Sequence, residues 1–241
     1  IMEKIKKFIN YFFKIFELKL IRTVNQFDNS YRLVLAFNEK QINFIFDVGA
    51  NEGQFVKELR YYGYKGNFLS FEPINTVHEK LLSNSAKDDN WEVYKPIALG
   101  NKNSENTINI SKNLVSSSIL EITDEHIENA PDSKFISKQP ISERKLDDIF
   151  SEFDLKNKNL FLKIDTQGYE YEVLKGAEKI LNEFQGILIE VSLTNLYKGQ
   201  KNWFDIVDFI QKKGFHLWSI DRGFSNKKNG KTLQLDLCFF R

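Results

Sequence analysis

From residue 42 onward, the chain alternates short apolar runs with stretches in which apolar residues recur every three or four positions. The apolar runs predict strands and the periodic stretches predict amphipathic helices. We expect strands at 43–48, 67–71, 92–98, 159–164, 186–191, 215–220 and 233–240, and helices at 54–62, 76–85, 169–182 and 203–213. Strands that alternate with helices are typical of βαβ units, so the pattern predicts an α/β fold with a mostly parallel sheet.

Two segments depart from this rhythm. Residues 100–143 are rich in Asn and Ser and contain two prolines, so we expect short strands and loops beside the sheet, where substrate contacts often lie. The loop 221–232 is too polar and too rich in turn residues to form a crossover helix. The last two predicted strands should therefore form an antiparallel hairpin at the end of the sheet.

The first 17 residues have the most regular amphipathic pattern in the chain, with Ile and Phe on one half of a helical wheel and mostly Lys on the other. The apolar run is too short to cross a bilayer and no small-residue cleavage site follows it, so we expect neither a transmembrane span nor a signal peptide. Two hypotheses stay open: the helix packs on the domain or on a second subunit in a homodimer, or it lies on an anionic membrane surface. We divide the chain into an N-terminal helical extension, 1–41, and one domain, 42–241.

Composition narrows the class of function. Lys and Arg total 34 and Asp and Glu total 33, so no overall charge favours binding to nucleic acid. The single cysteine, Cys238, excludes an internal disulfide framework and fits a reducing compartment, so we expect a cytoplasmic protein, whether free or at the inner face of the membrane. None of the three histidines has a second ligand at metal-binding spacing, which argues against a zinc site.

The turn after the first predicted strand carries the clearest chemical signal. Asp47-Val-Gly-Ala-Asn-Glu-Gly53 leads from an apolar strand into a helix, which predicts bare backbone N–H groups and a positive helix end facing a nucleotide-like ligand. The spacing is not Gly-x-Gly-x-x-Gly, because Asn51 and Glu52 stand where a pyrophosphate needs open backbone. Glu72 ends the next strand, where an acid is expected to accept hydrogen bonds from two ribose hydroxyls. The alternative is that Glu72 only caps the helix that follows.

A series of motifs gives the chain a family resemblance. The motifs are DVGANEG (47–53), FEP (71–73), ALG (98–100), SSS (116–118), LDD (146–148), KIDTQGYE (163–170), VLKG (173–176) and IEV (189–191). In this order and spacing, from about residue 42 to 220, they resemble the FkbM-type methyltransferases. The resemblance implies the Rossmann-like class I methyltransferase fold with seven strands, and S-adenosylmethionine as cofactor. Thr166-Gln167 departs from the family pattern, which more often has Val-Glu there.

The resemblance also implies which residues hold the cofactor. They are Asp47, Gly49, Ala50, Asn51 and Gly53 at the turn, Glu72 and Pro73 after the second strand, and Ala98 and Leu99 at the end of the third. The turn would surround the methionine part, Glu72 the ribose, and the third strand the adenine. A sulfonium cofactor carries no phosphate, so a turn with an acid and an amide suits its amino-acid end better than it would suit a dianion.

Methyl transfer to a hydroxyl also requires the removal of a proton. Asp165 ends the fourth strand, at the sheet edge where ligands of such folds lie, and we expect it to act as general base or to position the acceptor hydroxyl. Lys163 points the same way and could hold that carboxylate ionised and oriented. Glu190, at the end of the fifth strand, is the second candidate. The alternatives are that Asp165 caps the next helix and that Glu190 makes a buried structural hydrogen bond.

The resemblance implies O-methylation, with sugar hydroxyls of surface glycans or secondary metabolites as acceptors. Aromatic residues near strand ends are candidates for stacking on a sugar ring, and lysines in the loop 221–232 are candidates for binding an acidic group. These residues are Tyr197, Trp203 and Trp218, and Lys227, Lys228 and Lys231.

Three competing hypotheses stay open. Asp165, Glu170 and Glu190 could gather around Mg²⁺, but Glu170 lies within a helix pattern compatible with a solvent-facing position, so we assign no metal ligand. An NAD(P)-dependent oxidoreductase would use the same sheet and the same Glu72. A non-catalytic protein would act through its N-terminal helix on a membrane or on a partner.

Overall fold

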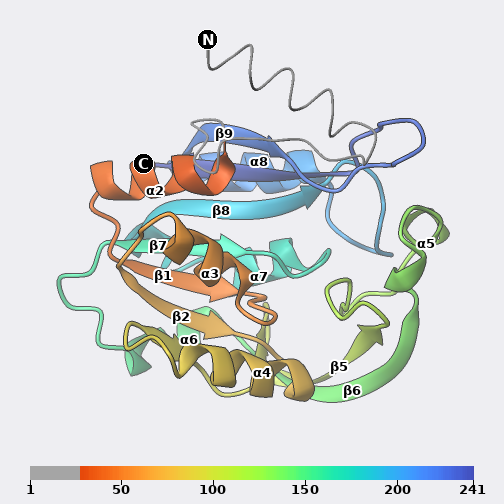
Figure 1. Ribbon diagram of the computed structural model, residues 1–241, viewed down its shortest axis with the longest axis horizontal. Helices are drawn as coiled ribbons and strands as arrows, with labels where there is room; N and C mark the ends of the chain where they lie inside the picture. The colour runs from red at the N-terminus through yellow and green to blue at the C-terminus, as the bar shows by residue number, and fades with distance from the viewer. Residues whose placement is uncertain (1–27) are drawn as a thin grey trace, which may run out of the picture.

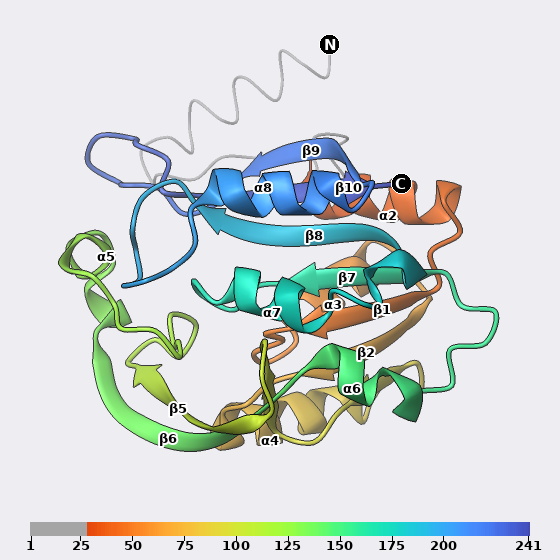
Figure 2. The same cartoon turned by 180° about the vertical axis from the view of Figure 1, so that it is seen from behind.

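Figures 1 and 2 show the computed structural model, which describes residues 28–241. An open seven-stranded sheet lies at its centre, in the order β3-β2-β1-β7-β8-β10-β9. Its strands are β1 (Phe44–Val48), β2 (Asn67–Phe71), β3 (Trp91–Val93), β7 (Leu160–Ile164), β8 (Phe184–Ser192), β9 (His216–Arg222) and β10 (Gln234–Phe240). Neighbouring strands are parallel except β10, which runs antiparallel to β8 and β9. The order and the C-terminal hairpin confirm the predicted class I, Rossmann-like fold.

Helices cover both faces of the sheet (Figures 1 and 2). On one face lie α2 (Asn29–Glu39) and α3 (Gln54–Tyr61), with α4 (Asn75–Ser85) beside β3, and on the other lie α6 (Leu146–Ile149), α7 (Glu170–Gly176) and α8 (Trp203–Lys212). Because both faces are covered, β1 and β7 are buried at every position. Each contains a single charged residue, Asp47 in β1 and Lys163 in β7.

Helix α2 was not predicted by the periodicity. It begins after Asp28, whose side chain accepts hydrogen bonds from the backbone of Ser30 and Tyr31. Its apolar side packs Val34 and Phe37 into the same core as β1 and β7. The helix therefore belongs to the core, although it lies within the range 1–41 that the sequence assigns to an extension. The amphipathic stretch 1–17, with its membrane and dimer hypotheses, lies outside the described residues.

A second, three-stranded sheet flanks the carboxyl ends of the central strands (Figure 1). Its order is β4-β6-β5, with β4 (Ile97–Leu99), β5 (Ser104–Ser111) and β6 (Phe135–Arg144), and α5 (Asp124–Asn129) lies in the connection between β5 and β6. The prediction of one strand at 92–98 is wrong, because the chain leaves the central sheet after Val93 and joins the small sheet at Ile97. Pro96 lies at the break, where it removes a ladder donor.

The other boundaries agree with the sequence to within two residues, with one exception. The helix predicted at 169–182 ends at Gly176. A Cβ on Gly176 would lie 1.8 Å from the backbone oxygen of Gly100, so the helix touches the loop after β4 at this position. No helix within residues 28–241 combines the length and the apolar composition needed to span a bilayer.

Candidate active site

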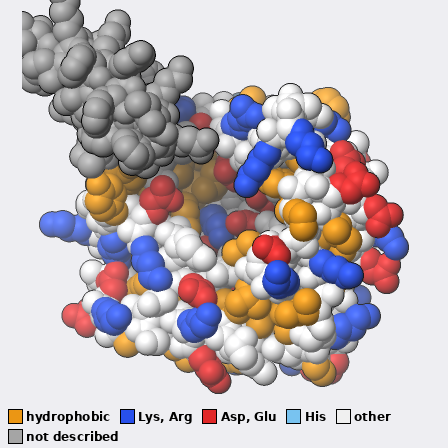
Figure 3. All heavy atoms as spheres, turned by 45° about the vertical axis from the view of Figure 1, so that its right-hand side comes forward, with side chains coloured by type: hydrophobic (Ala, Val, Ile, Leu, Met, Phe, Trp, Pro, Cys, Tyr) orange, Lys and Arg blue, Asp and Glu red, His pale blue; other side chains and the backbone are white. Residues whose placement is uncertain are grey.

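A cavity of about 690 Å³ lies at the carboxyl ends of the central strands, between the large sheet and the small one. Figure 3 looks into this hollow, where acidic and basic side chains lie together. Seven of the nine residues implied for the cofactor line it, namely Gly49, Ala50, Asn51, Glu72, Pro73, Ala98 and Leu99. The three candidate catalytic residues, Lys163, Asp165 and Glu190, line it too. The structure therefore brings most of the sequence-derived site into one place.

The backbone N–H groups of the turn after β1 are bonded within the protein, contrary to the prediction that they are free to meet a ligand. Three of them donate to backbone oxygens: Gly49 N and Ala50 N to Phe71 O (3.1 and 3.0 Å), and Gly53 N to Ala50 O (2.8 Å). The other two donate to side chains: Asn51 N to Glu72 Oε2 (3.0 Å) and Glu52 N to Asn51 Oδ1 (2.8 Å). A phosphate-binding loop leaves such groups open for the anion. This turn does not, which argues against a cofactor held by its phosphates.

The two glycines of the turn are required by close packing. Both have a left-handed backbone, with φ of +74° at Gly49 and +82° at Gly53. A Cβ on Gly49 would lie 1.8 Å from the carbonyl oxygen of Asp165, and one on Gly53 would lie 2.2 Å from the ring of Trp91. Gly49 therefore allows the ends of β1 and β7 to approach each other. Gly53 packs on Trp91 and does not line the cavity.

Asp47 lies beneath the cavity, with no exposed surface. The Nζ of Lys163 is 3.0 Å from Asp47 Oδ1, and it also donates to the carbonyl oxygen of Gly49 at 3.0 Å. Its distance to Asp165 Oδ2 is 3.9 Å. Burial lowers the pKa of Lys163, but the charges of Asp47 and Asp165 outweigh burial and the net shift is upward, so the lysine stays charged. Its main partner is thus Asp47 and not, as expected, Asp165.

Glu72 lies at the end of β2 and is almost completely buried. Its two carboxylate oxygens accept hydrogen bonds from Asn51 N (3.0 Å) and Ile74 N (2.9 Å). Burial raises the pKa of Glu72 to about 7, against the lowering effect of these two hydrogen bonds and of Lys163. The acid therefore fixes the backbone before α4, as the capping hypothesis held, and it also lines the cavity.

Asp165 follows β7 and does not cap α7. Its Oδ1 accepts a hydrogen bond from Gln167 Nε2 at 2.8 Å, and its side chain is 38% exposed. The turn is instead closed by Glu170, whose Oε1 accepts the N–H groups of Thr166 and Gly168, both at 2.9 Å. Glu170 is buried rather than turned to solvent, and burial raises its pKa to about 7. Glu170 thus closes the turn that precedes α7, no side chain caps the helix itself, and Asp165 remains available to a ligand.

Glu190 faces the same cavity from β8. Its Oε2 accepts hydrogen bonds from Gln167 Nε2 (2.8 Å) and Gln234 Nε2 (2.6 Å). Burial raises the pKa of Glu190 well above its usual value, and the charges of Asp165 and Asp236 add to this effect. The structural hydrogen bond expected as the alternative role is present, and it is made to side-chain amides inside the site.

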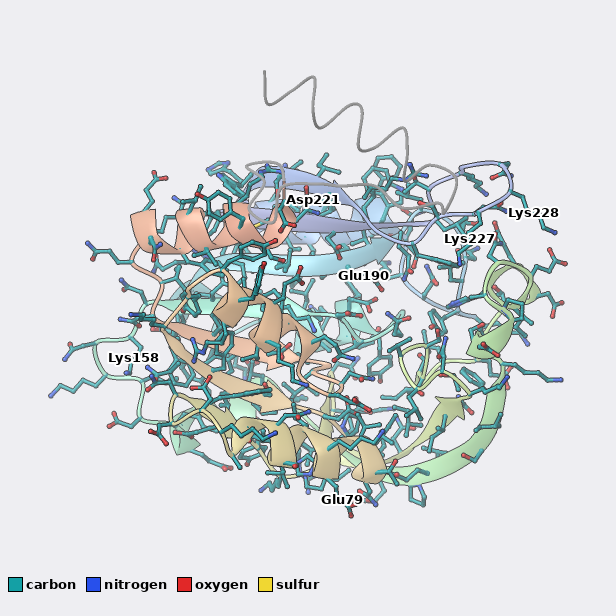
Figure 4. The ribbon with its side chains drawn as sticks, in the orientation of Figure 1. Glu79, Lys158, Glu190, Asp221, Lys227 and Lys228 are labelled. Atoms are coloured by element: carbon teal, nitrogen blue, oxygen red, sulfur yellow. The ribbon has the colours of Figure 1, made fainter. Side chains whose placement is uncertain are left out.

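A row of acids continues across the sheet from Glu190. Asp236 of β10 stands opposite Glu190 on one side and Asp221 of β9 on the other, and Figure 4 labels Glu190 and Asp221. Like charges at directly opposite positions repel each other. Arg32 of α2 neutralises the outer end through Asp221 at 3.1 Å, whereas burial and then the charge of Asp165 raise the pKa of Asp236 to about 6.

Sequence reasoning missed the amides of Gln167 and Gln234. Gln167 was noted only as a departure from the family pattern, and Gln234 carries no motif. The alternation along β10, which places Gln234 and Asp236 on one side of the strand, is the signal that could have indicated it. It also missed His126 of α5, which lines the cavity although it is 3% exposed.

The proposed sugar-stacking and anion-binding residues do not line the cavity. Tyr197 is fully buried outside the cavity lining, and neither Trp203 nor Trp218 reaches the cavity. The aromatic rings that do line it are Phe55, Phe71, Tyr169 and Phe224. In Figure 4, Lys227 and Lys228 lie on the outer loop between β9 and β10, away from Glu190, and Lys231 pairs with Glu125 at 3.1 Å.

The magnesium hypothesis also finds no support in the geometry. Residues 28–241 contain no group of three or more His, Cys, Asp or Glu placed to hold a metal ion. The amide of Gln167 stands between Asp165 and Glu190, while the carboxylate of Glu170 is bonded to the backbone of its own turn.

Comparison with known proteins gives the family. A family model described as the methyltransferase FkbM domain matches residues 47–217. The chain belongs to the FkbM methyltransferase family. It is therefore an enzyme, an S-adenosylmethionine-dependent methyltransferase, as the motifs predicted. The match runs from Asp47 in β1 to the start of β9, so it leaves out part of the cavity lining, including Asp221 of β9 and Gln234 and Asp236 of β10.

Among curated proteins, this methyltransferase is similar to the 2-O-methyltransferase NoeI of Sinorhizobium fredii, with 24% identity over 186 residues that cover 75% of this chain and 76% of NoeI. Among solved structures it is similar to the ribosomal protein L11 methylase of Lactobacillus delbrueckii, with 11% identity, 88% and 76% of the chains covered and a TM-score of 0.46. It is also similar to Aeropyrum pernix fibrillarin in complex with S-adenosyl-L-methionine, with 10% identity, 87% and 76% covered and a TM-score of 0.42. Such distant likenesses add nothing to the sheet order described above.

Proposed function

We propose that this methyltransferase binds S-adenosylmethionine in the cavity and methylates a hydroxyl of a neutral sugar, in a surface glycan or a glycosylated metabolite. One observation carries the proposal. Glu72 and Asp165 line a single cavity on either side of a turn whose backbone N–H groups are all used within the protein. The arrangement offers a carboxylate for a ribose and a second carboxylate for a reacting hydroxyl, but no cradle for phosphate.

The cofactor half of the cavity fits a nucleoside that carries a sulfonium group. Glu72 uses one hydrogen bond on each oxygen, so each oxygen keeps a lone pair for a ribose hydroxyl. Ile74, Ala98 and Leu99 form an apolar wall suited to a base. Gln54 and Phe55 line the cavity at the first turn of α3, where the helix dipole favours a carboxylate such as that of the methionine part. When bound, S-adenosylmethionine supplies a methyl group on a positively charged sulfur.

Asp165 is placed to hold the acceptor and to take its proton. One oxygen is committed to Gln167, and the other is 3.9 Å from Lys163, which is too long for a hydrogen bond. Oδ2 is thus available to accept a hydrogen bond from an acceptor hydroxyl and, as methyl transfer proceeds, its proton. Orientation of the hydroxyl toward the methyl group would supply much of the rate enhancement.

The charge of the lining supports a neutral acceptor. Among the described residues that line the cavity, six are acidic and Lys163 is the single Lys or Arg. Lys163 is already paired with Asp47. A phosphorylated or carboxylated sugar would therefore meet uncompensated negative charge, whereas sugar hydroxyls can donate to carboxylates. The similarity to a 2-O-methyltransferase supports oxygen as the acceptor atom.

The test is transfer of a labelled methyl group onto a panel of defined sugars. The panel pairs methyl glycosides of neutral hexoses and deoxyhexoses with the corresponding uronic acids and sugar phosphates, followed by glycan extracts that contain the same sugars. We expect label on neutral hydroxyls. Label on the acidic members only would contradict the choice of acceptor, and failure of the protein to bind S-adenosylhomocysteine would contradict the cofactor assignment.

A further inference from the structure

Gln167 lies between the two acids of the active site. Its Nε2 is 2.8 Å from Asp165 Oδ1 and 2.8 Å from Glu190 Oε2, and its Oε1 is 2.8 Å from the hydroxyl of Tyr197. The opposite amide orientation would turn an oxygen toward two carboxyl groups. The orientation described therefore satisfies all three neighbours at once. Both N–H bonds of the amide are used, one on each acid.

The backbone holds Gln167 in this place despite an unfavourable conformation. Its φ of +55° is uncommon for a residue with a side chain, and Gly168 follows with φ of +94°. The carbonyl oxygen of Gln167 accepts a hydrogen bond from Ser118 Oγ at 2.7 Å. A Cβ on Gly168 would lie 2.8 Å from the side chain of Tyr197, so the turn is packed tightly. Strain that surrounding contacts maintain at a ligand cavity indicates a functional requirement.

The two acids are bonded differently. Glu190 receives a second amide, from Gln234 at 2.6 Å, and both amides donate to its Oε2. Asp165 receives one amide, on Oδ1. The amide of Gln167 thus fixes the rotation of the Asp165 carboxyl group, with Oδ2 on the side away from the amide.

We propose that Gln167 is a positioning residue for methyl transfer, whose amide ties Asp165 to Glu190 and so holds the free oxygen of Asp165 toward the acceptor hydroxyl. This inference rests on the proposed function, in which Asp165 takes the proton of the acceptor. An amide is suited to this role because it donates to both acids without adding charge. A carboxyl group at the same position, which the family pattern more often has, can bridge the two acids only if one of the three groups holds a proton.

The charges around Asp165 and Glu190 also disfavour an ionised carboxyl group at position 167. Asp47 is paired with Lys163, and Asp221 is paired with Arg32. The groups whose charges act on the acid pair are Lys163 of β7, Glu170 of α7 and Asp236 of β10, and the hydroxyl of Tyr197 lies beside them. Lys163 is the single cation among them. A further negative charge at position 167 therefore has no free counter-ion, and the proton affinity of the pair should rise.

The test compares four variants by NMR titration of protein labelled with ¹³C in the side-chain carboxyl groups of Asp and Glu. Gln167→Glu replaces the amide by a carboxyl of the same shape, and Gln167→Met removes the donors without adding charge. Gln234→Met removes the second amide of Glu190 only. Gln211→Glu adds the same charge on the exposed side of α8 and is the matched control. Asp165→Asn and Glu190→Gln assign the signals, and each titration is run with and without S-adenosylhomocysteine.

We expect the protonation steps of the Asp165–Glu190 pair to move to higher pH by at least one unit in Gln167→Glu, and in the same direction in Gln167→Met. Gln234→Met should move the step assigned to Glu190 more than the step assigned to Asp165, and Gln211→Glu should move neither. The acid limb of the pH profile for methyl transfer onto a neutral sugar should follow the titration. Unchanged carboxyl titration in folded Gln167→Met would overturn the proposal, whether or not Gln167→Glu folds. Absence of S-adenosylhomocysteine binding by the unaltered protein would instead refute the proposed function, because the titration without ligand still decides the role of Gln167.

Discussion

The ammonium group of Lys163 lies 3.0 Å from the carboxylate of Asp47, and the two residues form a buried ion pair between adjacent strands. They stand opposite each other in the register of β1 and β7. Lys163 also donates to the carbonyl oxygen of Gly49, so the pair fixes the turn that forms one side of the cavity. The pair supports the site from beneath.

Loss of Lys163 should therefore destabilise the fold strongly. Lys163→Met leaves the buried carboxylate of Asp47 with a hydrogen bond from Ser70 but without a counter-ion, and loss of a buried counter-ion typically costs about 3–5 kcal/mol. Urea unfolding measures the loss, and the double variant with Asp47→Asn should recover a substantial part of it. A loss below about 1 kcal/mol, the size expected of an exposed pair, would contradict the structural role.

Gly49→Ala should destabilise the protein far more than Gly63→Ala. Both glycines have positive φ, so each substitution carries a conformational cost of about 1–2 kcal/mol. Around Gly63 a Cβ meets nothing within 4 Å, whereas at Gly49 it would lie 1.8 Å from Asp165 O. The difference between the two unfolding free energies isolates the close approach of β1 and β7. Equal losses would show that the two strand ends do not meet as described.

The fold should lose stability as the pH rises from about 5.5 to about 8. Burial raises the pKa of Glu72 and Glu170 to about 7 and that of Asp236 to about 6, so the folded chain keeps protons that the unfolded chain has already released. The stability that these acids contribute is fully present below their pKa in the unfolded chain, and it is lost as the pH rises through their higher pKa in the folded chain. Burial lowers the pKa of His126 to about 4, so below about pH 6.5 this residue makes the fold more stable as the pH rises. The three acids outweigh this single histidine.

Calorimetry at a series of pH values measures this effect as a fall in Tm. Glu170→Gln should flatten the fall, since this acid closes a turn and does not need to ionise. A Tm that rises steadily from pH 5.5 to 8 would contradict the assigned burial of these acids.

Asp165→Asn should abolish most turnover and leave cofactor binding intact. Loss of a general base typically lowers the rate by about 10²–10⁴-fold. The dissociation constant of S-adenosylhomocysteine should change less than twofold, and Asp154→Asn, on an exposed loop, is the control. Turnover is measured by methyl transfer onto the sugar that accepts label. If the Asp165 variant keeps its full rate, another group takes the proton.

The sequence predicted the central sheet well because its strands are buried on both faces and interrupted by strong turns. Runs such as 44–48 and 160–164 are apolar apart from Asp47 and Lys163, which made both the strands and their polar residues visible. The break between β3 and β4 was missed because a short apolar stretch through Pro96 does not reveal that it pairs with two different sheets.

The sequence predicted which residues form the candidate site better than it predicted the hydrogen bonds and ion pairs between them. Motif spacing identified Glu72, Asp165 and Glu190, which all line the cavity. It could not show that the N–H groups of the turn are used internally, or that Lys163 pairs first with Asp47. It also gave no sign that Gln167 joins the two acids. These facts depend on contacts between segments far apart in the chain, and a single sequence does not encode them locally.

The central claim is that Glu72 holds the ribose of the cofactor in this cavity. Isothermal titration with S-adenosylhomocysteine tests it most directly, on the unaltered protein, on Glu72→Gln and on the exposed control Glu79→Gln of α4, which Figure 4 labels on the outer surface. We predict binding to the unaltered protein and to Glu79→Gln, and at least tenfold weaker binding to folded Glu72→Gln, a change of about 1.4 kcal/mol or more. Absence of binding heat with the unaltered protein, or equal affinity in all three, would contradict the account.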